Sequence, residues 1–220
     1  MQHNLPDDPF HALYQSPPVL QHLIDEGHLG QKSGAGFYKK VGKDILRLDG
    51  SRRDYVPSGV KADDLVVRML KEKDPAKRIK ALHDASHPQA KFLWAILRDA
   101  FHYIAVHLHS IADNARDVDF ALRWGFGWQQ GPFELWQSAG WQQIAQWVKE
   151  DIDAGRALSS APLPDWVFDG REGVHRSEGS WSASKQTYVP CSQLPVYTRQ
   201  PFRASVVGDL SLIHISEPTR

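Results

Sequence analysis

The feature that most constrains this chain is a segment with helical periodicity between Gln89 and Ala112. Apolar side chains recur there every three or four residues, which places them on one face of an α-helix. Its 24 residues would form a helix roughly 36 Å long, enough to cross a domain. We therefore predict a helical domain built around this segment. The expected apolar face consists of Phe92, Ala95, Ile96, Ala100, Tyr103, Ile104, His107, Leu108 and Ile111.

Shorter helices are expected on both sides of this segment. Residues that favour helix starts are Ser16 with two prolines after it, Asp63 or Asp64, Pro75, Asp117 or Asp119, and Pro132, and glycines that favour helix ends are Gly27, Gly125, Gly140 and Gly155. A turn around residues 41–44 predicts a small β-hairpin near residues 36–48. Residues 156–209 are rich in Pro, Ser and Gly, which predicts an irregular or poorly ordered tract. The fold class is therefore expected to be mainly α, a helical bundle with a small hairpin and an irregular C-terminal third.

Composition excludes several classes of protein. Lysine plus arginine equals aspartate plus glutamate, 26 against 26, so no basic field indicates a nucleic-acid partner. No apolar run is long enough to predict a membrane span, and the first ten residues do not resemble a signal peptide. A single cysteine, Cys191, cannot form an internal disulfide and fits a reducing cytoplasm.

The glycine-rich loop at residues 28–38 is the first candidate ligand site. Gly34 and Gly36 begin a dinucleotide-binding pattern, but Lys39 stands where the third glycine belongs, and a strand is expected to follow the loop instead of a helix. Pyrophosphate recognition needs a loop that runs into a helix N-terminus. We therefore expect the glycines to serve a tight turn that presents Lys32, whose charge would face either a phosphate or water.

Other side-chain patterns give no catalytic or metal centre. His83 and His87 have helical spacing, but no carboxylate or thiolate of suitable spacing completes a metal site. Seven of the eight tryptophans lie between Trp94 and Trp166. We expect the aromatic segments at 124–128 and 131–136 to pack helix against helix, with a carbohydrate-binding platform as the open alternative.

Two stretches resemble the C-terminal helical domain of 3-hydroxyacyl-CoA dehydrogenases. Residues 17–40 resemble that domain's closing pattern, L-G-x-K-x-G-x-G-F-Y, and residues 117–140 are similar to its pattern D-x-D-x-A, G-x-G and G-P-F-x-L-x-D-x-x-G, with Gln137 where the family usually has aspartate. The matching positions that we take as structural or substrate-side candidates are Gly30, Lys32, Gly34, Gly36, Phe37, Tyr38, Asp119, Gly125, Gly131, Pro132 and Phe133.

The order of these stretches is reversed relative to a single family domain, which implies two tandem copies. The expected divisions are 1–40 as the tail of a first copy, 41–88 as a connecting segment with the hairpin and short helices, 89–155 as a second copy, and 156–209 as a linker. Residues 210–220 resemble the translation of a sequencing-library adapter and are left out of the fold prediction. The second copy shows no closing pattern of its own.

The resemblance implies a piece of a cytoplasmic, NAD-dependent 3-hydroxyacyl-CoA dehydrogenase of fatty-acid β-oxidation, of a multifunctional type that can carry a fused enoyl-CoA hydratase. The catalytic residues and the NAD site would lie in an upstream domain, so we expect no catalytic, cofactor or metal residue in this piece and no activity from it alone. Its expected role is to cover the acyl-CoA and to make domain or homo-oligomer contacts. The alternative is a non-catalytic helical protein-interaction module.

Overall fold

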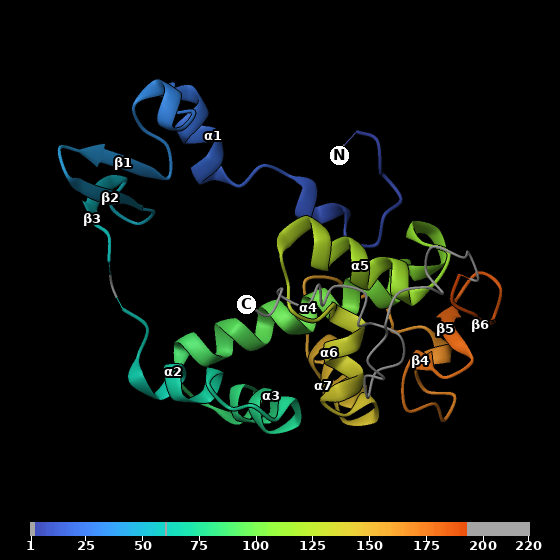
Figure 1. Cartoon of the computed structure of the whole chain (residues 1–220). Helices are drawn as coiled ribbons and strands as arrows, with labels where there is room; N and C mark the ends of the chain where they lie inside the picture. The colour runs from blue at the N-terminus through green and yellow to red at the C-terminus, as the bar shows by residue number, and fades with distance from the viewer. Residues whose placement is uncertain (1–2, 60, 193–220) are drawn as a thin grey trace, which may run out of the picture. The chain divides into compact units, whose positions relative to one another are not determined.

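The computed structural model describes residues 3–59 and 61–192. It divides into two compact units, one up to Asp63 and one from Asp64 onward (Figure 1). The described residues are mainly helical with two small antiparallel sheets, which confirms the predicted class. The division separates the hairpin from the short helices of the expected connecting segment 41–88, because the hairpin belongs to the first unit and those helices to the second.

The first unit joins one short α-helix to a three-stranded sheet. Two short 3-10 turns, His11–Tyr14 and Gln31–Ser33, lie before and after α1 (Pro18–Asp25). The start of α1 differs slightly from the expectation, since Pro17 takes the N-cap position and no side chain caps the helix. Gly27 has the left-handed backbone expected after the helix, with φ of 71°.

The sheet of the first unit has one strand more than predicted. β1 (Tyr38–Val41) and β2 (Asp44–Asp49) form the expected hairpin, with Val41 opposite Asp44. β3 (Asp54–Pro57) then pairs antiparallel with β2. A run of charged residues, Arg52 to Asp54, leads into β3 and hides it in the sequence, because only two apolar residues remain to show a strand pattern.

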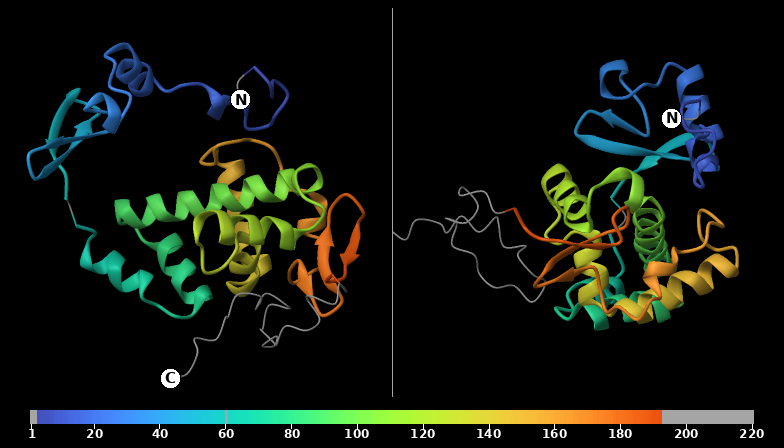
Figure 2. Two further views of the ribbon diagram at one scale, coloured as in Figure 1. Left: turned by 45° about the horizontal axis from the view of Figure 1, so that its top comes forward. Right: turned by 90° about the vertical axis from the view of Figure 1, so that its right-hand side faces the viewer.

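Six helices form the body of the second unit, close to the expected positions. They are α2 (Asp64–Leu70), α3 (Pro75–Asp84), α4 (Pro88–Ile111), α5 (Ala115–Phe126), α6 (Pro132–Ser138) and α7 (Trp141–Asp153). Helix α4 packs against α3, α5, α6 and α7 and is the long helix at the centre of Figure 2. No helix within the described residues has the length and apolar character that crossing a bilayer requires.

The predicted apolar face of α4 is confirmed in part, since Ile104, His107 and Leu108 are buried as expected. Phe92 is 64% exposed, and Ile96 and Ile111 are about half exposed. The other buried residues of the helix lie outside the predicted face: Ala90, Trp94, Arg98, Phe101, His102 and Ala105. Periodicity misled here because the buried face carries Arg98 and His102. Arg98 pairs with its neighbour Asp99 and with the distant Asp151, and His102 bonds the distant carbonyl of Ala161.

Helix α5 begins before and ends after its expected limits. Asn114 caps it by accepting the N–H of Arg116, so the helix starts before Asp117. Gly127, with φ of 69°, is its left-handed C-cap, and Gly125 lies inside the last turn. The two aromatic segments also separate, because Phe133 and Trp136 are buried whereas Trp124, Phe126 and Trp128 are exposed. Only the second segment confirms the expected core packing.

Residues 156–192 are not a linker, which corrects the expectation for this part of the tract. They contain a 3-10 turn (Asp165–Val167) and a second three-stranded sheet, β4 (His175–Arg176), β5 (Gly179–Ser182) and β6 (Thr187–Val189). Figure 2 shows this sheet beside the helices. Leu163, Val167, Val174 and Trp181 belong to the same apolar core as the helices. The rest of the tract, and residues 210–220, lie outside the described residues.

Candidate functional site

A buried carboxylate at the centre of the second unit connects the two halves of the D-x-D and G-P-F pattern. Asp119 lies on α5, and Val118 beside it belongs to the core. Its Oδ1 accepts the N–H of Phe133 at 2.8 Å, at the start of α6. The approach of the two segments requires a glycine at 131, since a Cβ there would lie 2.3 Å from the Asp119 side chain. Asp119, Gly131 and Phe133 are thus brought together as a clamp between α5 and α6.

The first turn of α6 completes this clamp. Pro132 occupies the first helical turn, where a missing N–H costs nothing. Glu134 accepts the N–H of Gly131 through Oε2 at 2.9 Å, and Arg123 of α5 donates to its Oε1 at 2.9 Å. Glu134 is buried, so this ion pair connects α5 and α6 away from solvent.

A second layer of polar contacts attaches the C-terminal sheet to these helices. His175 Nε2 lies 2.7 Å from Asp119 Oδ2, and His175 Nδ1 lies 2.8 Å from Ser180 Oγ. On α6, Gln137 Oε1 accepts the N–H groups of Val174 and His175 at 2.9 Å, and its Nε2 donates to the His175 carbonyl at 3.0 Å. Gln137 therefore recognises the backbone at the start of β4.

The line of Ser180, His175 and Asp119 resembles a nucleophile, base and orienting acid in composition only. All three side chains are at most 5% exposed, so a substrate has no access to the hydroxyl. Burial raises the pKa of Asp119 to about 6, although the hydrogen bond from His175 lowers it. The arrangement fits a structural network that holds the sheet on the helices.

An open cavity of about 760 Å³ lies next to this network. It is lined by Pro75, Gln137, Ser138, Gly170, Glu172, Gly173, His175 and Arg176. The ring nitrogens of His175 face Asp119 and Ser180. Both polar atoms of the Gln137 amide bond the backbone at residues 174–175. The His175 ring and the Gln137 amide are therefore already engaged within the protein.

The glycine loop of the first unit is a rigid turn that leads into a strand. Gly30 and Gly34 have φ of 123° and 85°, and the chain continues from Gly36 into β1. A Cβ on Gly36 would lie 2.9 Å from the Cα of Gly30, so the two ends of the loop touch. Lys32 is exposed at its tip. Because no helix N-terminus follows the loop, these residues do not fit the pyrophosphate of a dinucleotide.

The remaining sequence candidates lie at exposed positions. Phe37 and Tyr38 are exposed at the start of β1. Gly125 has an ordinary backbone, and a Cβ added to it would meet no atom within 4 Å, so nothing in the structure requires glycine there. The candidates of the first unit and those of the second belong to separate compact units.

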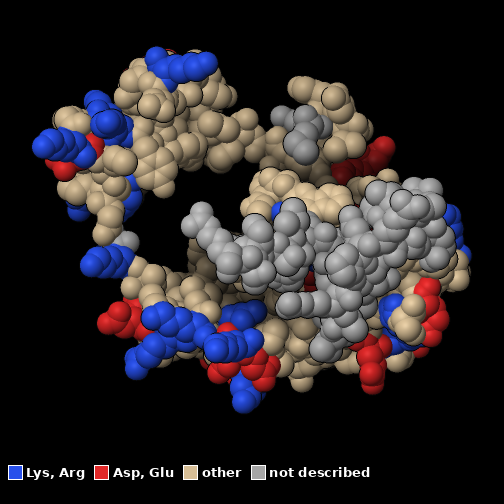
Figure 3. Space-filling view, in the orientation of Figure 1, with Lys and Arg blue, Asp and Glu red and all other residues tan. Residues whose placement is uncertain are grey.

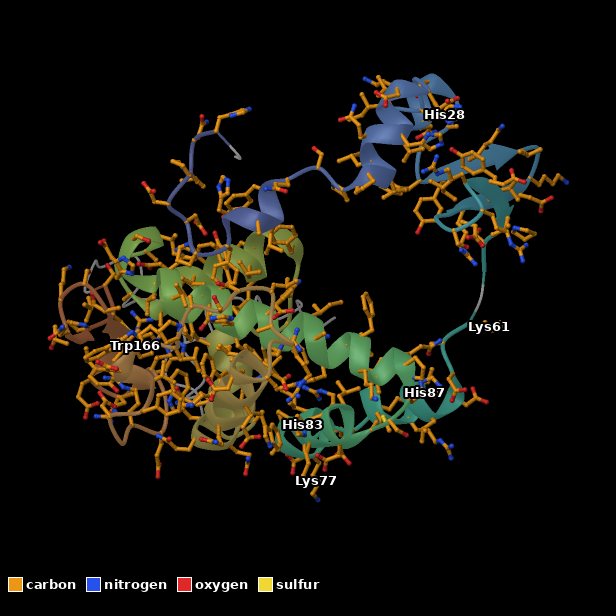
Figure 4. The ribbon with its side chains drawn as sticks, turned by 180° about the vertical axis from the view of Figure 1, so that it is seen from behind. His28, Lys61, Lys77, His83, His87 and Trp166 are labelled. Atoms are coloured by element: carbon orange, nitrogen blue, oxygen red, sulfur yellow. The ribbon has the colours of Figure 1, made fainter. Side chains whose placement is uncertain are left out.

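His83 and His87, both labelled in Figure 4, serve packing and capping. His83 of α3 stacks on Trp147 of α7 at 4.1 Å and meets the edge of Trp94 at 5.1 Å. His87 caps α4 by accepting the N–H of Gln89. Within residues 3–59 and 61–192, no three histidine, cysteine, aspartate or glutamate side chains are grouped as a metal site.

Sequence reasoning missed the partners that reach Asp119 from far along the chain. His175 is 56 residues away, and it lies in the tract that was expected to be a linker. Gln137 gave the one available signal, since it departs from the aspartate that the resemblance led us to expect. Its contact with residues 174–175 explains why a side chain with both an acceptor and a donor suits this position.

The fold and this network define a helical domain whose motif residues clamp its own elements together. In keeping with that class, the chain is 32% identical over 176 residues to a probable 3-hydroxyacyl-CoA dehydrogenase of Bacillus subtilis, covering 75% of this chain and 22% of that protein. Putative fatty acid oxidation complex trifunctional enzymes of Rickettsia felis and Rickettsia prowazekii are 28% and 24% identical, each over 73% of this chain and 21% of their own length. No protein-family profile and no solved structure matches.

The chain is thus a homologue of the 3-hydroxyacyl-CoA dehydrogenase family, as its motifs led us to expect. It spans about a fifth of the length of these curated relatives.

Proposed function

We propose that this chain supplies a helical, non-catalytic region of an NAD-dependent 3-hydroxyacyl-CoA dehydrogenase of fatty-acid β-oxidation. The observation that carries the proposal is the similarity to the Bacillus subtilis relative over 75% of the chain. The Asp119 clamp supports it, because the motif residues Asp119, Gly131 and Phe133 contact one another. The region would cover the acyl-CoA and make domain contacts, while hydride transfer to NAD and proton abstraction would belong to residues elsewhere in the whole protein.

An exchange of segments tests this proposal. The matched segment of the Bacillus subtilis relative is replaced by the corresponding residues of this chain, and reduction of NAD is followed with a short-chain and a long-chain 3-hydroxyacyl-CoA. We expect the chimera to reduce NAD and the isolated 220-residue chain to leave it oxidised. A folded chimera without activity, or turnover by the isolated chain, would contradict the assignment.

A helical interaction module is the second candidate, and exposed aromatic side chains favour it. At the end of α5, Trp124 is 60% and Phe126 75% exposed, and Trp124 stacks on Phe120 at 4.6 Å. Exposed aromatic clusters of this kind mark contact surfaces. This candidate predicts concentration-dependent association in sedimentation velocity that the double variant Trp124→Ser, Phe126→Ser abolishes. A monomer at all concentrations would leave this candidate without support.

A further inference from the structure

The two sheets of this chain share one plan. Each is a three-stranded antiparallel meander in which neighbouring strands are consecutive in sequence. The first turn has two residues in both sheets, 42–43 and 177–178, and the second has four, 50–53 and 183–186. Short sheets with identical turn lengths in both connections already suggest a common structural unit.

The end of each meander repeats in conformation and in sequence. Arg53 and Gln186 immediately precede the third strand, and they are the two non-glycine residues with positive φ in the described part of the chain, at 54° and 51°. A left-handed non-glycine residue is uncommon, so its recurrence at the same place is informative. The third strands then continue as Tyr-Val-Pro in both sheets, at residues 55–57 and 188–190.

Hydrogen bonds align the beginnings of the meanders as well. Tyr55 donates its hydroxyl to the Gly36 carbonyl at 2.6 Å, and Tyr188 donates its hydroxyl to the Gly173 carbonyl at 3.2 Å. Both glycines lack room for a Cβ. The pairing makes Gly173 the counterpart of Gly36 in the closing pattern.

The next residues correspond in the same way. The N–H of Leu48 donates to the Phe37 carbonyl at 2.8 Å, and the N–H of Trp181 donates to the Val174 carbonyl at 2.7 Å. Val174 therefore takes the place of Phe37, and His175 takes the place of Tyr38. Residues 173–175 thus form a second closing segment, equivalent to Gly36, Phe37 and Tyr38. The glycine is the only residue type that the two segments share at these three positions.

The two closing segments differ in what covers them. In the second unit, Gln137 of α6 bonds the backbone of Val174 and His175, and Asp119 of α5 bonds the His175 ring. In the first unit the equivalent Phe37 and Tyr38 are 49% and 65% exposed. The surface that a helix pair covers in one meander is therefore open in the other.

Charge indicates which side chain would fit the open surface. The first meander carries Lys39, Lys40 and Lys43 on and beside β1, and Lys and Arg side chains are prominent on this unit in Figure 3. A carboxylate on this surface would accept the N–H groups of Phe37 and Tyr38, as Gln137 accepts those of Val174 and His175. It would in addition complement the lysine charges.

We infer that the Phe37–Tyr38 edge of the first meander is a docking surface for a second helix pair of the α5–α6 type. The occupant has a G-P-F turn, as α6 does at residues 131–133, and a carboxylate at the position of Gln137. That carboxylate accepts the N–H groups of Phe37 and Tyr38, as Gln137 accepts those of Val174 and His175. The inference concerns assembly and does not depend on the proposed oxidation reaction.

The test supplies this helix pair in cis. A second copy of residues 112–140, carrying Gln137→Asp, is fused ahead of the full chain through a flexible linker, and hydrogen exchange is measured at Phe37 and Tyr38. The matched control carries Gln137→Leu in the fused copy, which keeps the helix and removes the acceptor. We expect exchange at these two amides to be slower by about tenfold in the aspartate fusion. Equal exchange in the two fusions, with the fused copy folded, would overturn the inference.

A second measurement decides if the fused copy does not fold. Hydrogen exchange is followed in the intact Bacillus subtilis relative at the positions that align with Phe37 and Tyr38. Protection there, against rapid exchange in this chain alone, supports a helix pair seated on this edge. Exchange as rapid as in this chain alone would refute it. Neither readout involves catalysis, so the outcome is separate from that of the activity assay.

Discussion

Asp119→Ala is expected to unfold or strongly destabilise the second unit. The substitution removes the acceptor of the Phe133 N–H at 2.8 Å and the partner of His175 Nε2 at 2.7 Å. Both groups are buried, and each unsatisfied buried donor costs about 1 to 3 kcal/mol. The two together give a loss of roughly 2 to 6 kcal/mol, a large share of the about 5 to 15 kcal/mol that holds an ordinary domain.

The free energy of unfolding is measured by urea denaturation, with tryptophan fluorescence reporting the core around Trp136 and Trp141. Asp113→Ala is the matched control, since Asp113 lies just before the same helix and outside the buried core, and its loss should stay within about 0.5 kcal/mol. If Asp119→Ala costs no more than this control, the buried carboxylate does not hold the sheet and α6 together, and the clamp described above is wrong.

Three further predictions concern the same unit. Gly131→Ala should lower the melting temperature sharply because its Cβ would overlap the Asp119 side chain, whereas Gly125→Ala, with open space around it, should leave it unchanged or raise it slightly; equal effects would contradict the clamp. Because folding raises the pKa of Asp119 from 3.8 to about 6, the folded state binds the proton more tightly, so the stability of the native chain relative to Asp119→Asn should fall as pH rises from about 4 to about 6. If urea titrations give the same difference in free energy of unfolding at every pH in this range, the raised pKa of Asp119 is wrong. Arg98→Met should cost about 3 to 5 kcal/mol, since it removes the cation shared by Asp99 and the buried Asp151; a loss below about 1 kcal/mol in the same assay would show that Arg156 and Trp94 suffice for Asp151.

Local signals in the sequence determined most of the secondary structure. Prolines and glycines at helix ends, together with apolar spacing, placed α1, α3, α4, α6 and α7 close to their observed limits. These signals work because capping and backbone preference act within a few residues of one another. The family resemblance likewise depended on short local patterns, and the relatives confirm it.

The burial of α4 and the role of the last described residues were decided by contacts between distant parts of the chain. The core-facing side of α4 includes Arg98, which a hydrophobic pattern assigns to solvent. Its charge is compensated by the adjacent Asp99 and by Asp151, which lies 53 residues later. The strands of 175–189 are too short and too polar to be recognised from their pattern, yet Asp119 and Gln137 fix them on the helices.

The sequence by itself thus determined where helices begin and end and which family the chain resembles, since both follow from neighbouring residues. The tertiary structure alone decided that Asp119 has His175 as its partner and that a second three-stranded sheet follows the helices. A buried polar group needs a hydrogen-bond partner, and the partner of Asp119 lies 56 residues away, outside the range of any local sequence pattern.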